Sequence, residues 1–275
     1  MKDVSFGQYY PAQSFVHKLD PRVKILAVIA YIVGVFLVKP FHYLGFLACF
    51  FLVVVATAFS RVPFLRVLKS IKGILFVIVF SAVLQLFFNG QGTPVITLGA
   101  VVITDIGLLN AVFLILRIAL VVLGASLLTL TTSPVEIADG IESLLSPLKW
   151  IKFPVHEFAL IMSIALRFIP TLLDETDRII RAQKARGADF ESGNVFKRAK
   201  ALIPVLIPLL ISSFRRADEL ADAMDSRCYS GSKNRTKFKK MRVTWRDLIA
   251  VIAVAGLIVG VVFLNKFYLV LTVAL

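Results

Sequence analysis

The stretch that decides the fold is residues 106–131, IGLLNAVFLILRIALVVLGASLLTLT, which contains one charged side chain, Arg117. A helix needs about 20 apolar residues to cross the hydrocarbon core of a bilayer, so this run predicts a complete membrane span. The whole chain shares the bias: 58% of its 275 residues are hydrophobic and 17% are charged. Soluble domains have roughly 45–50% apolar and about 25% charged residues. The sequence therefore predicts an all-α membrane protein.

Four further apolar runs bring the expected number of transmembrane helices to about five. They cover residues 23–38, 43–59, 73–88 and 248–275. Residues 95–103 alternate weakly between apolar and polar side chains, which indicates either a small hairpin or a re-entrant stretch.

Lysine and arginine are distributed so that one side of the membrane carries nearly all of them. Four precede the first span, four lie between the second and third spans, and twenty lie in residues 133–246. Residues 89–105 have none, and the loop between the first two spans has only Lys39. Because cytoplasmic loops are rich in these residues, we expect a multi-pass plasma-membrane protein with a cytoplasmic N-terminus. The net charge of +14 then contacts the lipid bilayer, and no nucleic-acid recognition motif accompanies it.

The pattern predicts three regions along the chain. Residues 1–132 hold four transmembrane helices, residues 133–246 form a cytoplasmic region, and residues 247–275 form the C-terminal transmembrane helix. Within the middle region we expect two long helices, residues 154–186 and 194–227, each apolar in its first half and charged in its second. Their apolar halves are short for spans, so we expect them to lie at the membrane interface. Two additional spans are the alternative, and prolines 204 and 208 should bend or break the second helix.

Each long helix ends on an arginine between small residues. The two tips are Ala185-Arg186-Gly187 and Ser226-Arg227-Cys228. Aligning them matches about a dozen positions at an offset of 41 residues, too short a repeat to exclude chance. Small neighbours let a partner approach closely, and the guanidinium fork pairs with carboxylates or carbonyls. The tips are therefore candidate docking elements for a partner with two equivalent sockets; alternatively each arginine caps its own helix or faces solvent.

The sequence contains no motif for catalysis or for binding a cofactor. It has no G-x-x-x-x-G-K-[ST] phosphate loop, no H-E-x-x-H or G-x-S-x-G motif and no Cys/His cluster. We therefore expect no catalytic residues, no metal and no cofactor, and any ATP would be bound by another subunit. Arg117 is a charge inside a span and is a candidate for an intramembrane polar contact. It is also the residue on which the alternative function depends, a stand-alone secondary transporter.

Several motifs resemble those of the transmembrane (T) component of energy-coupling factor importers, the EcfT/CbiQ-like family. The resemblance spans nearly the whole chain, and both arginine tips take part in it. The other matching motifs are Leu19-Asp20-Pro21-Arg22-Val23-Lys24, Thr131-Thr132-Ser133-Pro134, Leu166-Arg167-Phe168-Ile169-Pro170 and Arg215-Arg216-Ala217-Asp218-Glu219-Leu220.

The resemblance implies a non-catalytic scaffold with defined partners. In this family the two long helices are coupling helices, and each arginine motif enters a groove in one of two cassette ATPases. The apolar sides of these helices hold a membrane-embedded, substrate-binding S component, and ATP-driven closure makes the S component topple and release a vitamin or other micronutrient inside. The second tip departs from the Ala-Arg-Gly pattern because Cys228 replaces the glycine, which affects the geometry expected at that helix end.

Overall fold

The computed structural model describes residues 9–40, 42–88, 92–98, 101–151, 154–190, 192, 194–231 and 243–273. The chain forms two compact units, which are treated separately below. The larger unit comprises residues 7–140 and 241–275, and the smaller comprises residues 141–240 with 1–6. The division falls inside one helix, whereas the sequence-based boundary at residue 133 falls just before that helix.

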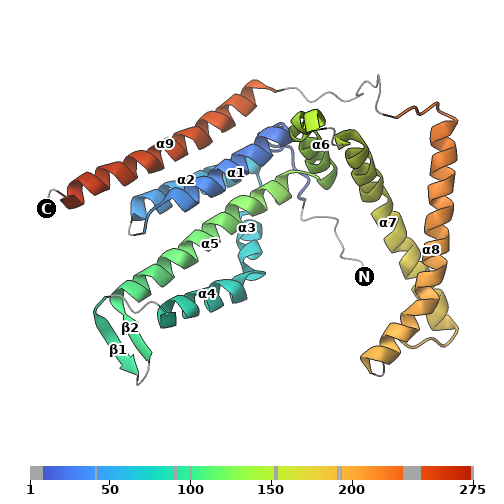
Figure 1. The fold of residues 1–275 in the computed structure, drawn as a ribbon, viewed down its shortest axis with the longest axis horizontal. Coiled ribbons are helices and arrows are strands. Elements are labelled where there is room, and N and C mark those ends of the chain that lie inside the picture. The colour runs from blue at the N-terminus through green and yellow to red at the C-terminus, as the bar shows by residue number, and fades with distance from the viewer. Residues whose placement is uncertain are drawn as a thin grey trace. The chain divides into compact units, whose positions relative to one another are not determined.

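The larger unit is mostly helical (Figure 1). Its elements are α1 (Pro21–Leu37), α2 (Tyr43–Ser60), α3 (Phe64–Lys72), α4 (Leu75–Phe88), β1 (Pro94–Leu98), β2 (Val101–Thr104), α5 (Asp105–Thr131), the first part of α6 (Pro134–Leu144) and α9 (Trp245–Val273). β1 and β2 pair antiparallel as a hairpin, which decides between the two interpretations of residues 95–103.

Four helices of the described residues are long and apolar enough to cross a membrane, and five candidates result if the bent pair α3–α4 is one span. These are α2, α5, α7 (Val155–Ala185) and α9, and the bend between α3 and α4 is 58°. The prediction of an all-α membrane protein with about five spans is confirmed, but the set of helices differs from the expected one. Helix α1 has 17 residues and falls just short of a span, while α7, expected at the interface, has the length and composition of one.

Apolar side chains lie on both the inside and the outside of the larger unit. Val35, Cys49 and Val53 belong to a buried core at the centre of the helices, while Phe51 and Phe76 are exposed by 68% and 78%. In water such exposure would be costly, whereas lipid tails are as apolar as these side chains. The outer surface of this unit therefore fits a hydrocarbon environment.

Three side chains donate hydrogen bonds to backbone carbonyls between α1 and α5. Lys24 Nζ donates to the Thr131 carbonyl at 3.0 Å, and the Tyr31 hydroxyl donates to the Leu120 carbonyl at 3.2 Å. Arg117 Nη2 donates to the Val38 carbonyl at 2.7 Å. The last four carbonyls of a helix have no partner within it, so Lys24 caps the end of α5 and Arg117 caps the end of α1.

The smaller unit holds the rest of α6, a 3₁₀ helix (Ser146–Ile151), α7 and α8 (Val195–Asp225). Helices α7 and α8 are in contact and run in opposite directions, so that α7 ends where α8 begins (Figure 1). Helix α8 continues through Pro204 and Pro208, so of the expected bend or break, the break does not occur. Pro208 has no N–H to bond the Pro204 carbonyl, and Gln183 Nε2 on α7 donates to that carbonyl at 3.5 Å.

Candidate functional site

The first arginine tip is a tightly hydrogen-bonded helix end. Helix α7 ends at Ala185, and Arg186 is its C-cap residue. Gly187, with φ of +89°, donates its N–H to the Lys184 carbonyl at 3.0 Å, and the Ala188 N–H donates to the Gln183 carbonyl at 3.0 Å. This pair of bonds is the Schellman motif, which needs a left-handed residue one position after the cap. Glycine meets that need because it has no Cβ.

The second tip has the same hydrogen bonds although it lacks glycine. The Cys228 N–H donates to the Asp225 carbonyl at 2.9 Å, and the Tyr229 N–H donates to the Met224 carbonyl at 3.0 Å. Each atom pair lies 41 residues after its counterpart at the first tip. Cys228 adopts φ of +56°, a left-handed conformation that side chains other than glycine rarely take. The cap geometry expected to suffer from the loss of glycine is therefore kept, at the cost of strain at Cys228.

All six tip residues are exposed: Ala185, Arg186, Gly187, Ser226, Arg227 and Cys228. Among the described residues, neither Arg186 nor Arg227 has a side-chain hydrogen bond or ion pair. A Cβ added at Gly187 would meet no atom within 4 Å. The backbones of the tips are thus fixed by their own helix ends, while the two guanidinium groups are available to a partner. Whether they dock stays a prediction.

The likeness between the two helices extends well beyond the tips. Along both helices the side chains that are covered by neighbouring residues recur at spacings of 4, 4, 4, 3, 4 and 4 residues. On α7 these are Leu160, Ile164, Phe168, Leu172, Glu175, Ile179 and Gln183; on α8 they are Ala201, Val205, Leu209, Ser213, Arg216, Leu220 and Met224. Every member of the second set lies 41 residues after its counterpart in the first. The short match in the sequence therefore reflects a repeated helix with a repeated inner face, a regularity that chance accounts for poorly.

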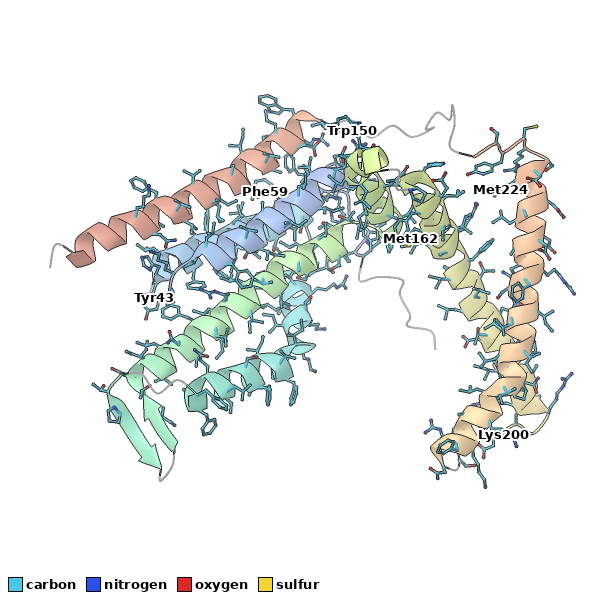
Figure 2. All side chains as sticks on the ribbon, viewed as in Figure 1. Tyr43, Phe59, Trp150, Met162, Lys200 and Met224 are labelled. Atoms are coloured by element: carbon cyan, nitrogen blue, oxygen red, sulfur yellow. The ribbon has the colours of Figure 1, made fainter. Side chains whose placement is uncertain are left out.

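The opposite face of α8 is apolar and exposed. Between Lys200 and Met224, both labelled in Figure 2, this helix presents seven large apolar side chains outward. They are Leu202, Ile203, Leu206, Ile207, Leu210, Ile211 and Phe214. On the first half of α7, Phe158, Ile161 and Met162 are also exposed. An uninterrupted apolar surface of this kind marks contact with lipid or with a partner.

Arg117 belongs to the larger unit and has partners there. Besides the bond to the Val38 carbonyl, its guanidinium carbon lies 5.9 Å from the ring centroids of both Phe36 and Phe46. The expected intramembrane polar contact exists within this chain. The structure therefore gives Arg117 a structural role at the end of α1 and does not bring it together with the tips in one unit.

Some residues with specific contacts are not evident from sequence reasoning. Glu175 and Arg216 pair across α7 and α8, and their separation of 41 residues, the repeat offset, is the signal that could have found them. Asp247 is 1% exposed and accepts from the Asp20 N–H at 2.7 Å and the Thr244 N–H at 2.6 Å, so one carboxylate holds the starts of α1 and α9 together. Nothing in the sequence indicates that second contact, because its donor is a backbone group 227 residues away.

Comparison with known proteins follows from this geometry. The family described as CbiQ, cobalt transport protein, matches residues 12–238. A protein named energy-coupling factor transporter transmembrane protein EcfT from Clostridium kluyveri is 50% identical over 251 residues, which cover 91% of this chain and 92% of the relative. Proteins of the same name from Thermosediminibacter oceani and Bacillus subtilis are 47% and 43% identical, and each match covers 94% of this chain and at least 97% of the relative. The chain belongs to the CbiQ/EcfT family and is a transmembrane component of an energy-coupling factor transporter.

Proposed function

We propose that this chain mechanically joins two cassette ATPases to a membrane-embedded S component and transmits ATP-driven motion from the former to the latter. The chain catalyses no reaction itself, and the partner ATPases bind and hydrolyse ATP. Its N-terminus lies in the cytoplasm, and both arginine tips face the ATPases from the cytoplasmic side of the plasma membrane.

The observation that carries this proposal is the pair of matching tips. Two helix ends with the same Schellman hydrogen bonds each present an exposed arginine without a side-chain partner among the described residues. They lie at opposite ends of the α7–α8 pair (Figure 1). A partner composed of two similar subunits offers two similar sockets, so two similar tips at opposite ends of one element suit it. A socket lined by carboxylates or carbonyls would bind each guanidinium through several donors.

The apolar face of α8 supports the second half of the proposal. Leu206, Leu210 and Phe214 lie on one exposed strip of the same helix that ends in Arg227. An apolar partner packed on that strip would be displaced by any motion of the arginine tip, because a helix transmits displacement along its length. The S component is that partner, and the vitamin or other micronutrient that is imported is chosen by the S component.

The stand-alone transporter loses its main support. That alternative required Arg117 as a free charge on a solute pathway, whereas Arg117 donates to the Val38 carbonyl at the end of a neighbouring helix. A basic side chain in this position has a structural reason to be there.

Affinity purification tests the proposal. The tagged full-length chain, extracted from its native membranes in mild detergent, should retain two ATPase subunits and one small membrane protein in fixed ratio. Matched purification of an unrelated multi-pass protein with the same tag is the control. Recovery of this chain alone, with solute uptake intact when it is reconstituted by itself, would overturn the proposal in favour of a stand-alone transporter.

A further inference from the structure

The contact at the crossing of α7 and α8 is polar, although most of the covered stripe on both helices is aliphatic. Glu175 on α7 accepts a hydrogen bond from the Ser212 hydroxyl at 2.6 Å through Oε1 and pairs with Arg216 Nη2 through Oε2. The side chains of Glu175 and Arg216 are 23% and 29% exposed, so both are largely withdrawn from water. A partly buried ion pair with a second hydrogen bond on its carboxylate is well satisfied.

The position of this pair in the repeat is informative. Glu175 and Arg216 are 41 residues apart, the same offset that relates Arg186 to Arg227. The two helices therefore meet where their equivalent positions coincide. Identical charges at that point would repel each other, and the repeat carries opposite charges there instead.

The surroundings make the pair hard to replace by chance alternatives. A hollow of about 400 Å³ adjoins it and is lined by Thr171, Asp174, Arg178, Ile179 and Ala182. With Glu175 and Arg216 the lining has two carboxylates and two guanidinium groups. Loss of either partner leaves one uncompensated charge in a partly buried place.

Aliphatic stripes with a spacing of mostly four residues do not fix their own register. If one helix slides past the other by one turn, about 5.4 Å, similar side chains are covered again. A charged pair does not tolerate that slip, because its members separate, and a single polar contact is known to set register in helix pairs for this reason. Ser212, one turn before Arg216, adds a second contact that depends on the same register.

We infer that Glu175 and Arg216 are a positioning pair that fixes the register of α7 against α8 and thereby sets the separation between the two arginine tips. The pair itself touches no partner. Its value for transport rests on the proposed function, because two sockets on a pair of ATPases require two tips at one defined distance.

Distances between spin labels test the inference without any partner. Labels at Ala182 and Ala223, exposed equivalent positions near the tips, are introduced in the full-length chain carrying Cys49→Ala and Cys228→Gly and placed in lipid nanodiscs. The parent should give one narrow distance distribution. Glu175→Arg or Arg216→Glu alone should broaden it or shift its maximum by on the order of 5 Å, one helical turn. The charge exchange Glu175→Arg with Arg216→Glu should restore the parent distribution.

Arg215→Glu is the matched control, because Arg215 is exposed and carries the same charge one residue away. It should leave the distribution unchanged. Unchanged distances in both single variants, failure of the exchange to restore them, or an equal effect of Arg215→Glu would each overturn the inference. The proposed function fails by a different result: ATPases that do not bind the parent chain although its label distances are narrow.

Discussion

Replacement of Arg117 by leucine separates a structural role for this residue from a role on a solute pathway. The substitution removes the 2.7 Å bond to the Val38 carbonyl and the two ring contacts at 5.9 Å, while it keeps an apolar side chain inside α5. The Val38 carbonyl at the end of α1 then loses its charged donor.

The magnitude follows from the contacts that are lost. A hydrogen bond to a charged group contributes about 1.5–3 kcal/mol in soluble proteins, but polar contacts between membrane helices average about 0.6 kcal/mol and reach about 1.7 kcal/mol. Cation–π contacts close to the 6 Å limit add about 0.5 kcal/mol at most. We therefore expect Arg117→Leu to lower the free energy of unfolding by about 1–2 kcal/mol.

The assay is reversible unfolding in mixed micelles, combined with solute uptake. Asn265→Leu is the matched variant, because Asn265 Nδ2 donates to the adjacent Leu37 carbonyl at 2.8 Å with no charge involved. It should cost less than Arg117→Leu. A loss below about 0.3 kcal/mol for Arg117→Leu would refute the reasoning. Parent-like stability with uptake abolished would return Arg117 to the solute pathway.

Three further predictions concern strain, protonation and topology. Cys228→Gly should stabilise the end of α8 by about 0.5 kcal/mol, because relief of the left-handed conformation outweighs the added chain entropy, and Gly187→Cys should destabilise α7; hydrogen exchange at the two ends measures both, and a looser α8 end in Cys228→Gly contradicts the strain. Burial lowers the pKa of His17 from its ordinary 6.5, aided by Lys24 and opposed by the Tyr10 carbonyl and Glu136, so the neutral ring is favoured on folding; protection of residues 10–17 from exchange should be full above pH 6.5 and fall as the pH drops further, with no such fall in His17→Gln, and a pH-independent parent is the contrary result. A cysteine replacing Gln91 should react with an impermeant reagent from outside and one replacing Ser232 only after permeabilisation, two positions that lie outside the described residues; the reverse pattern contradicts a cytoplasmic N-terminus.

The sequence predicts the membrane fold well because the property that decides it is composition along the chain. Runs such as residues 106–131 must be helical in lipid, since no water is present to bond free backbone groups. The same reasoning is weak for α7, where an apolar half and a charged half make one helix that satisfies the composition of a span and of an interfacial helix alike.

The candidate tips were found from the sequence because a repeat compares the chain with itself. Their hydrogen bonds were not, and Cys228 shows why: the chain adopts a left-handed residue there without the glycine that normally signals one. Contacts made to backbone carbonyls, such as that of Arg117 with Val38, leave no trace in the identity of the acceptor residue. These partners become visible only when the helices are placed beside one another.

The most direct test of the central claim is the double variant Arg186→Glu with Arg227→Glu. Loss of a buried charge-assisted contact costs on the order of 2–5 kcal/mol, and a remaining anchor partly masks a single loss. The single variants should therefore weaken ATPase association or uncouple hydrolysis from uptake, and lysine at either site should replace arginine poorly because the fork is lost. Arg215→Glu is again the control for charge. The measurement is co-purification of the ATPases together with solute uptake: the account predicts that the double variant inserts in the membrane but neither binds ATPases nor supports uptake, and a double variant that assembles and transports like the parent would contradict it.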